Sequence, residues 1–129
     1  MNKIWGKVRK GDQRGKDLGF PTANINLTKN IPEGIYISKI KLENKIFPAL
    51  TFIGRADTFN SKKKNCETYI LDFGKEFYGK WITVNLLKKI RENEKFNSVK
   101  ELIIEMKKDE QEARKYFEIN SWLNGSEIF

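Results

Sequence analysis

The chain of 129 residues contains no histidine and a single cysteine, Cys66. Without histidine, His-based zinc sites and Ser-His-Asp triads are excluded. Acid–base chemistry near neutral pH must then fall to a carboxylate, a lysine or a tyrosine. One cysteine cannot form an internal disulfide, which is typical of a reducing compartment, so we expect a cytoplasmic protein. Cys66 itself is expected to be an inert strand residue and not a nucleophile.

Long apolar segments are missing as well. No run reaches the roughly 18 apolar residues of a membrane span, and the N-terminus lacks the apolar core of a signal peptide. Hydrophobic residues still make up 39% of the chain and aromatic residues 12%, which is typical of a folded globule. The length suits one domain, and we treat residues 1–129 as a single domain without a flexible linker.

Arginine is scarce in a strongly basic chain. The formal net charge is +8, yet only 5 of the 25 basic residues are arginine and 20 are lysine. One interpretation is an anionic partner, such as nucleotide phosphates or nucleic acid. The other is a general compositional bias toward lysine, because surfaces that bind phosphate tend to use the planar fork of arginine. We favour bias as the source of most of the charge.

A glycine-rich segment near the N-terminus is the most informative part of the sequence. Gly11, Gly15 and Gly19 recur every four residues, and Pro-Thr-Ala-Asn follows within two residues of the last one. Glycines let backbone N–H groups crowd around an anion. In a strand, Thr22 and Asn24 share one face and present the hard oxygens that Mg²⁺ prefers. No Gly-Lys pair is followed by Ser or Thr, so the segment is not a Walker A loop.

The first two thirds of the chain show strand patterns. The expected strands are 4–10, 34–42, 45–53, 65–73 and 80–90, with 43–44 as a hairpin turn. Short strands without intervening helices predict an antiparallel barrel or sandwich. From residue 99 to about 117 the apolar residues follow a helical period, and Ser98 with Glu101 forms a capping-box pattern. This segment is predicted to be an amphipathic helix that covers the barrel.

Two further segments carry candidate chemical groups. Glu67 lies in a strand that is otherwise largely apolar. It is either a solvent-exposed residue at the end of the barrel or a carboxylate held for catalysis. Phosphoryl transfer to an alcohol needs a carboxylate near the attacking hydroxyl, together with a metal and backbone donors. The corner between the last strand and the helix carries Arg91 and Glu94, which either line a pocket or form an ordinary exposed turn.

These segments together resemble the riboflavin kinase (flavokinase) family over about residues 4–113. The shared landmarks occur in order: Gly11 to Asn24 with its Leu-Gly-Phe-Pro-Thr-Ala-Asn ending, Pro32 to Tyr36, Ile53-Gly54, Glu67, Phe77 to Gly79, and Arg91 to Ser98. The resemblance implies a six-stranded antiparallel Greek-key barrel with a C-terminal helix. It also implies ATP-dependent conversion of riboflavin to FMN.

The resemblance implies a role for each candidate residue. Glu67 is the general base for the ribityl 5′-hydroxyl, and Thr22 and Asn24 serve both the nucleotide and its Mg²⁺. The loop over the ATP phosphates includes Gly11, Gly15 and Lys16. The flavin-side positions are Ile70, Asp72, Arg91 and Glu94. The expected partners are therefore riboflavin and ATP, with Mg²⁺ as cofactor, no nucleic acid, no membrane and a monomeric state.

Two departures qualify the resemblance. Asp57 stands where the family often has proline, and Glu94 stands where some members have a basic residue. FAD synthesis is not predicted, because no nucleotidyltransferase pattern accompanies this domain. The competing function is a non-catalytic basic barrel that binds RNA or single-stranded DNA. We disfavour it because aromatic residues do not interleave with arginine along one strand face.

Overall fold

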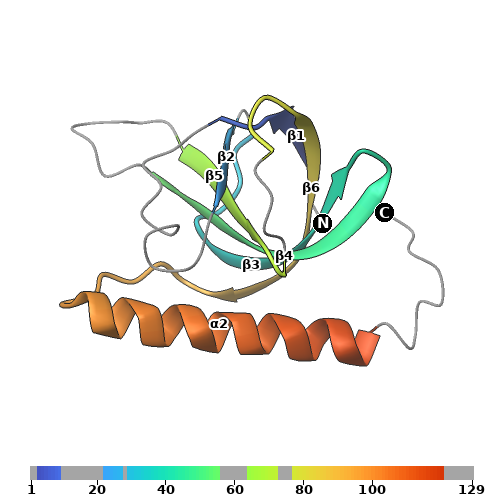
Figure 1. The fold of residues 1–129 in the computed structure, drawn as a ribbon. Coiled ribbons are helices and arrows are strands. Elements are labelled where there is room, and N and C mark those ends of the chain that lie inside the picture. The colour runs from blue at the N-terminus through green and yellow to red at the C-terminus, as the bar shows by residue number, and fades with distance from the viewer. Residues whose placement is uncertain (1–2, 10–21, 28, 56–63, 73–76, 121–129) are drawn as a thin grey trace.

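The computed structural model describes residues 3–9, 22–27, 29–55, 64–72 and 77–120. Within these ranges the chain forms six strands followed by one helix (Figure 1). The elements are β1 (Lys3–Lys7), β2 (Ala23–Asn26), β3 (Gly34–Leu42), β4 (Lys45–Arg55), β5 (Lys64–Ile70), β6 (Trp81–Arg91) and α2 (Val99–Asn120). No helix in the described ranges is long and apolar enough to cross a membrane.

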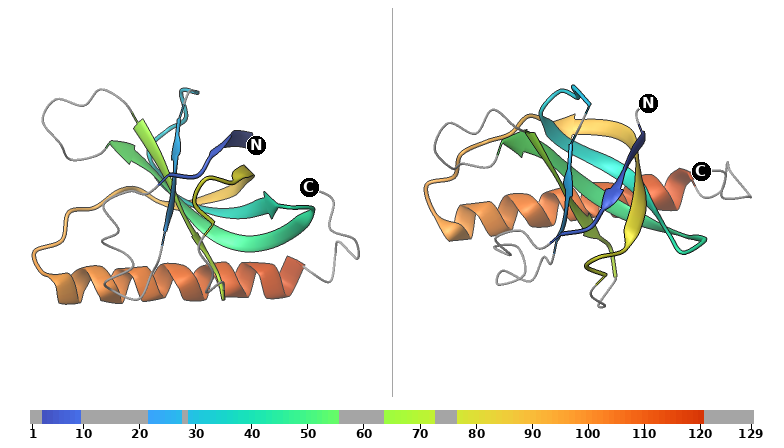
Figure 2. Two further views of the ribbon diagram at one scale, coloured as in Figure 1. Left: turned by 45° about the horizontal axis from the view of Figure 1, so that its top comes forward. Right: turned by 90° about the horizontal axis from the view of Figure 1, so that it is seen from above.

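The strands form one antiparallel sheet in the order β1-β6-β3-β4-β5-β2. The sheet curls so far that its edges meet: Arg9, just past β1, forms a bridge with Asn24 of β2. The main-chain N–H of Arg9 donates to the carbonyl of Asn24 at 2.8 Å. The expected six-stranded antiparallel barrel with a C-terminal helix is confirmed (Figures 1 and 2).

Local sequence explains where the chain turns and where its edges approach. The hairpin between β3 and β4 turns at Glu43 and Asn44, which both have positive φ, the geometry of tight two-residue hairpin turns. Gly6 of β1 lies so near β2 that a Cβ atom there would be 2.1 Å from Cγ2 of the buried Ile25. A residue without a side chain is therefore required where the barrel closes.

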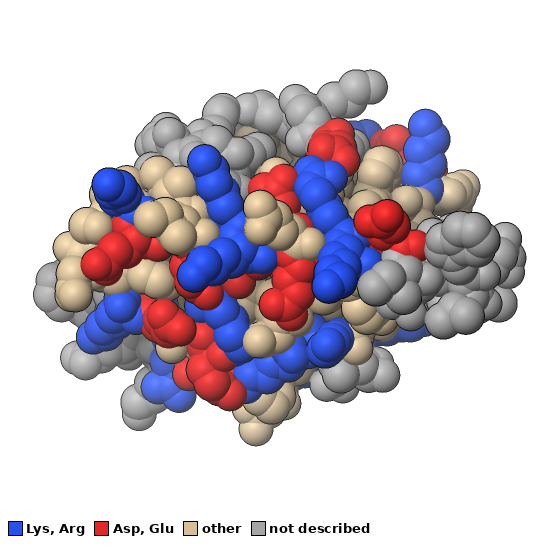
Figure 3. Space-filling model, turned by 90° about the horizontal axis from the view of Figure 1, so that it is seen from below, with Lys and Arg blue, Asp and Glu red and all other residues tan. Residues whose placement is uncertain are grey.

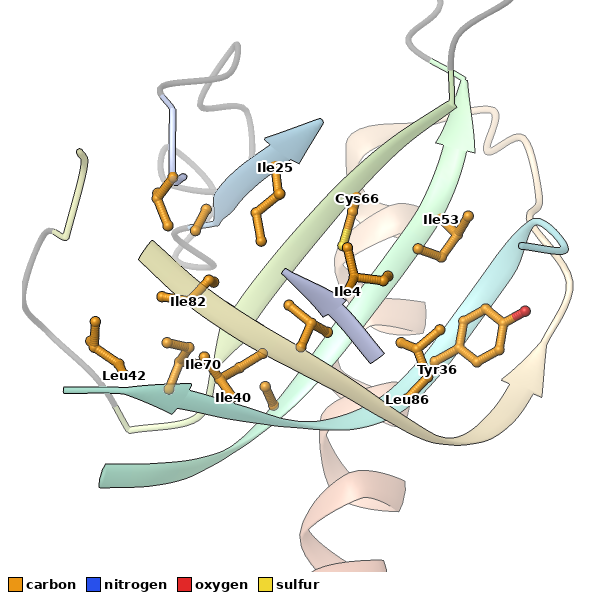
Figure 4. Packing of buried hydrophobic residues seen from close by; sticks show 14 of the residues in the cluster. Ile4, Ile25, Tyr36, Ile40, Leu42, Ile53, Cys66, Ile70, Ile82 and Leu86 are labelled. Carbon is orange, nitrogen blue, oxygen red and sulfur yellow. The ribbon is translucent and has the colours of Figure 1, made fainter. Parts of the chain in front are cut away.

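Strand alternation fills the barrel with aliphatic side chains, as Figure 4 shows. The core includes Ile4, Ile25, Ile40, Ile53, Ile82 and Leu86, all at most 2% exposed. Three hydroxyls are also buried among the strands. The side chain of Thr51 lies 2.7 Å from that of Ser38 and 2.8 Å from that of Thr68, and all three residues are 0% exposed. The three groups satisfy one another, as buried polar groups must.

A second apolar cluster joins the outer face of the barrel to α2. Ile35, Ile37 and Leu50 of the sheet pack in this cluster with Ala113 of the helix, which is fully buried. One half of the predicted capping box is present, since Ser98 Oγ accepts from the N–H of Glu101 at 3.2 Å. The Glu101 carboxylate accepts from the N–H of Asn97, one residue before the cap, at 3.1 Å. The helix begins at Val99 as predicted and continues to Asn120, three residues past the expected end.

Candidate active site

The pairing of β2 with β5 brings the three central candidate residues together. Asn24 stands directly opposite Glu67 in the register, and Thr22 immediately precedes β2. Thr22 Oγ1 donates a hydrogen bond to Glu67 Oε1 at 3.0 Å. Residues directly opposite one another, and residues two apart along a strand, share one face of a sheet. The amide, the hydroxyl and the carboxylate therefore form one polar cluster.

This cluster lies on the outer face of the barrel. Along β5, Cys66, Thr68 and Ile70 are buried, whereas Glu67 and Tyr69 are partly exposed on the opposite face. Glu67 is also the only carboxylate in the six described strands. Glu67 is half-buried and hydrogen-bonded, so its carboxylate is held in a defined position and does not extend freely into solvent.

Asn24 has an unsatisfied donor. Asn24 is 4% exposed, and the Oδ1 of its side chain accepts a hydrogen bond from Asn65 Nδ2 at 2.8 Å. Its own Nδ2 is buried and makes no hydrogen bond within the described part of the chain. A buried donor without an acceptor is costly and rare. Such a group is suited to receive an anionic oxygen of a ligand.

The cluster fits a divalent cation that arrives with a nucleotide. The Thr22 hydroxyl, the Asn24 carbonyl and the Glu67 carboxylate are all hard oxygen donors. Within the described ranges, no three His, Cys, Asp or Glu side chains gather into a metal cage. Mg²⁺ is typically bound by one or two protein oxygens, with phosphates and water supplying the rest. The donor set therefore fits Mg²⁺ bound to ATP better than a permanently held metal.

A row of residues continues from this cluster across the sheet. The register places Glu67 opposite Phe52, Phe52 opposite Ile35, and Ile35 opposite Arg91. Neighbouring strands are about 4.8 Å apart, so the row runs roughly 15 Å from the carboxylate to the arginine. The middle of the row is aromatic and aliphatic, and both ends are polar. Ile35 is buried beneath α2, so the part of the row that a ligand can reach is the partly exposed Phe52 beside Glu67.

The far end of the row is organised by α2. Arg91 Nε donates to Asp109 Oδ1 at 2.8 Å and Arg91 Nη2 to Asp109 Oδ2 at 2.7 Å, in a bidentate pair. Hydrogen bonding to Asp109 raises the pKa of Arg91. The guanidinium also lies 5.9 Å from the ring centre of Phe96. These contacts fix the arginine between the end of β6 and the helix.

A family model described as riboflavin kinase, or flavokinase, matches residues 2–117. The chain belongs to the riboflavin kinase family. It is 38% identical over 120 residues to the bifunctional riboflavin kinase/FMN adenylyltransferase of Bacillus subtilis, covering 88% of this chain and 38% of that protein. It is 41% identical over 115 residues to the trifunctional protein RibF/MnmA of Mycoplasmoides gallisepticum, covering 87% of this chain and 18% of that protein.

A solved structure agrees with this family. The chain superposes on the riboflavin kinase of Trypanosoma brucei with a TM-score of 0.64 and 28% identity, over 90% of this chain and 76% of that one. The chain spans less than half the length of the two bacterial relatives above. The similarity therefore concerns one part of those longer proteins.

The four predicted flavin positions of this riboflavin kinase family member do not form a single group. Arg91 and Glu94 lie near one another, since the charge of Glu94 contributes to the raised pKa of Arg91. Asp72 follows β5 and is paired with Arg114 of α2 at 2.8 and 2.9 Å, and this bonding lowers the pKa of Asp72. Ile70 points into the barrel core and is 3% exposed. Any flavin contact at Ile70 would come from its main chain.

The remaining predicted residues lie elsewhere. Gly11, Gly15 and Lys16 of the phosphate loop, and Asp57, fall outside the described residues, so the phosphate loop stays a prediction. Asn65 was not predicted, although it stands two residues before Glu67 and hence on the same strand face. That spacing is the signal in the sequence, but asparagine is frequent in this chain, so the spacing alone does not single out Asn65.

Proposed function

We propose that this chain is an ATP-dependent riboflavin kinase that transfers the γ-phosphoryl group of ATP to the ribityl 5′-hydroxyl of riboflavin, giving FMN and ADP. Family membership supports the reaction class. The observation that carries the proposal is the Thr22–Glu67 hydrogen bond beside the buried amide of Asn24. This arrangement offers a proton acceptor and an anion-binding donor within one cluster.

Glu67 is the proposed general base. As the 5′-oxygen attacks the γ-phosphorus, the bond from that phosphorus to the β–γ bridging oxygen breaks, and the hydroxyl proton passes to the Glu67 carboxylate. The Thr22 hydroxyl holds one carboxylate oxygen of Glu67 at 3.0 Å, so a neighbouring side chain orients the carboxylate. A carboxylate held in this way needs little reorientation before it accepts the proton.

Asn24 and Thr22 are proposed to bind the nucleotide. The unsatisfied Nδ2 of Asn24 donates to a phosphate oxygen, and its burial strengthens that interaction because water does not compete for the donor. Thr22 Oγ1 and Asn24 Oδ1 would hold Mg²⁺, which supplies charge neutralisation to the phosphates when bound. Gly11, Gly15 and Lys16 are proposed to contact the same phosphates.

The apolar row beyond Glu67 is proposed to support the flavin ring. Phe52 is the next residue in the row and provides an aromatic surface one strand away from the carboxylate. A ribityl chain that reaches Glu67 leaves the ring system beside the aromatic side chain of Phe52. Arg91 and Glu94 are proposed to contact the polar edge of the ring, and Asp72, which is held by Arg114, is proposed as a separate flavin contact.

The test is the variant Glu67→Gln. Glutamine keeps an acceptor for the Thr22 hydroxyl but has no basicity, so we expect FMN formation to fall about a hundredfold or more. Riboflavin affinity, followed by quenching of flavin fluorescence, should change by less than about threefold because the apolar row is intact. The conservative variant Thr22→Ser keeps the hydroxyl and serves as the matched control. An unchanged turnover in Glu67→Gln would contradict the proposed base.

A further inference from the structure

A second surface of the barrel combines exposed tryptophan with lysine. We call it the tryptophan–lysine face. It consists of the outward side chains of β1, the first half of β6 and the end of β3: Trp5, Trp81, Lys3, Lys7, Lys39 and Lys41. The register confirms that they share one face, since Lys7 pairs with Trp81, and Thr83 pairs with both Trp5 and Lys41. Figures 1 and 2 show β1 and the start of β6 on the side of the barrel away from α2.

The two tryptophans are stacked and exposed. Their ring centroids are 4.2 Å apart with an angle of 24° between the planes. Trp5 is 67% exposed and Trp81 is 52% exposed. The stack supports the pairing of β1 with β6, but smaller β-branched residues would also support it and would leave far less apolar area in water. Each ring still presents one face that the other ring does not cover.

Positive charge is concentrated on the strands. The six described strands contain ten basic side chains and one carboxylate, and that carboxylate is Glu67 on β5. The helix α2 carries five basic and six acidic side chains. Figure 3 shows blue and red residues interspersed on the helix side. Near the tryptophan–lysine face, Glu43 at the hairpin tip is ion-paired with Lys80.

We propose that the tryptophan–lysine face binds single-stranded nucleic acid. Bases stack on the open faces of Trp5 and Trp81, and Lys7 and Lys41 contact the phosphates on either side. Exposed aromatic rings within a basic strand surface are the two elements that sequence-tolerant binding of single strands requires. Bases on a single strand are free to extend an indole stack, whereas the bases of a duplex are already stacked on one another.

The proposed surface and the active site lie on different strands and adjoin at one edge, because Arg9, two residues after Lys7, bridges Asn24. Glu67 and Asn24 lie on β5 and β2, and the row that leads from them ends beneath α2. The inference therefore does not rest on riboflavin kinase activity. The sequence argued against nucleic-acid binding because aromatic residues do not interleave with arginine along one strand. In the fold, the aromatic residues interleave with lysine across neighbouring strands, and that objection no longer applies.

The experiment measures fluorescence anisotropy of labelled twelve-nucleotide strands, dT and U, with the full chain between 25 and 200 mM salt. The double variant Trp5→Ala/Trp81→Ala should weaken binding at least tenfold, given that each stacked base contributes about 1–3 kcal/mol, or roughly 5- to 150-fold. Lys7→Ala/Lys41→Ala should weaken binding and reduce the slope of log affinity against log salt by about 1.4. An abasic strand of the same length should bind at least tenfold more weakly than dT.

The matched control is Lys100→Ala/Lys107→Ala, which removes the same charge from exposed positions on α2 and should leave binding unchanged. FMN formation should be unaffected in the tryptophan variant, which shows that the barrel is intact. The inference is overturned if no strand binds at 25 mM salt, or if the helix variant loses as much affinity as the strand variant. It is equally overturned if the abasic strand binds as well as dT, if only phosphatidylserine vesicles bind, or if the tryptophans instead mediate self-association.

Discussion

Asn65 is a positioning residue at the proposed nucleotide site. Its side-chain amide donates to Asn24 Oδ1 at 2.8 Å and so fixes the orientation of the Asn24 amide. We expect Asn65→Ala to raise the KM for Mg-ATP about fivefold, since one hydrogen bond contributes about 1 kcal/mol. The KM for riboflavin should stay the same. Steady-state kinetics with each substrate varied in turn tests this, and equal changes in both KM values would argue for a general structural defect.

Cys66 illustrates how burial alters an ionisable group. Burial raises the pKa of its thiol to about 12, against about 9 for an exposed thiol. Between pH 9 and pH 12 the unfolded chain loses this proton while the folded chain keeps it, so alkaline pH favours unfolding. The free energy of unfolding should fall by about 1.4 kcal/mol per pH unit from this group alone.

The comparison with Cys66→Ala isolates that contribution. Other groups, including Tyr36 and Tyr69 with their raised pKa values, titrate in both proteins and cancel in the difference. Urea unfolding at pH 8, 9, 10 and 11 should therefore show a steeper decline for the native sequence than for the variant. Parallel declines would mean that the thiol ionises as readily in the folded chain as in the unfolded one.

Individual residues differ in how far the sequence predicts them. The strand faces of Thr22, Asn24 and Glu67 are predictable because period-two alternation assigns each residue to a face, whereas their chemical roles stay predictions. Asn65 and the orphaned Nδ2 of Asn24 are not predictable, since both depend on the register between β2 and β5. A shift of one residue in this register would place the side chains of either strand on the opposite face of the sheet.

At the scale of elements, α2 is attached to the barrel by apolar packing and by the Arg91–Asp109 pair. The side chains of these residues are 16% and 8% exposed. Asp109→Asn removes the charge that pairs with Arg91, and we expect a loss of about 2–3 kcal/mol in the free energy of unfolding. That is below the range for a fully buried pair, because Arg91 keeps some contact with water.

The control for this prediction is Glu112→Gln, which neutralises an exposed acid of the same helix and should change stability by less than about 0.5 kcal/mol. Urea denaturation measures both. The double variant Arg91→Met/Asp109→Leu should recover much of the stability that Asp109→Asn loses, because both charges of the pair are removed and Glu105, the other partner of Arg91, keeps Lys108 as a partner. If Asp109→Asn behaves like the control, the ion pair does not hold the helix.

The elements with local signals were predictable from the sequence. The hairpin at residues 43–44 and the start of α2 follow from turn chemistry and capping within a few residues. Closure of the barrel was not predictable in the same way. It depends on Gly6 approaching Ile25 and on Arg9 pairing with Asn24, which are contacts between segments that lie on either side of the glycine-rich segment in the sequence.

At the scale of the whole molecule, barrel and helix should unfold together. The cluster around Ile35, Ile37 and Leu50 is completed by Ala113 of α2, so loss of the helix exposes the outer face of the sheet. Circular dichroism at 222 nm and fluorescence of Trp5 and Trp81, in a Trp122→Phe background, should give coincident urea transitions. Two separated transitions would show that α2 detaches before the barrel opens.

The sequence alone leaves the distribution of charge undetermined. A net charge of +8 is the sum of a nearly neutral helix and strongly basic strands, and only the fold shows which surfaces each composition supplies. The predicted monomeric and cytoplasmic states stay predictions. The attribution of the positive charge to compositional bias also stays a prediction. The lysines of β1 and β3 lie around the Trp5–Trp81 pair, which favours an anionic partner for this part of the charge.

The hydroxyls of Ser38, Thr51 and Thr68 have a consequence for how this barrel can evolve. Thr51 occupies the centre of the trio and lies within reach of both neighbours. Replacing Thr51 with valine removes the hydrogen-bond partner that the two neighbouring buried hydroxyls share, whereas exchanging all three residues for aliphatic ones removes the need for hydrogen bonds at these positions. Descendants of this chain should therefore alter positions 38, 51 and 68 in concert, and intermediates with one hydroxyl missing should be short-lived in a lineage.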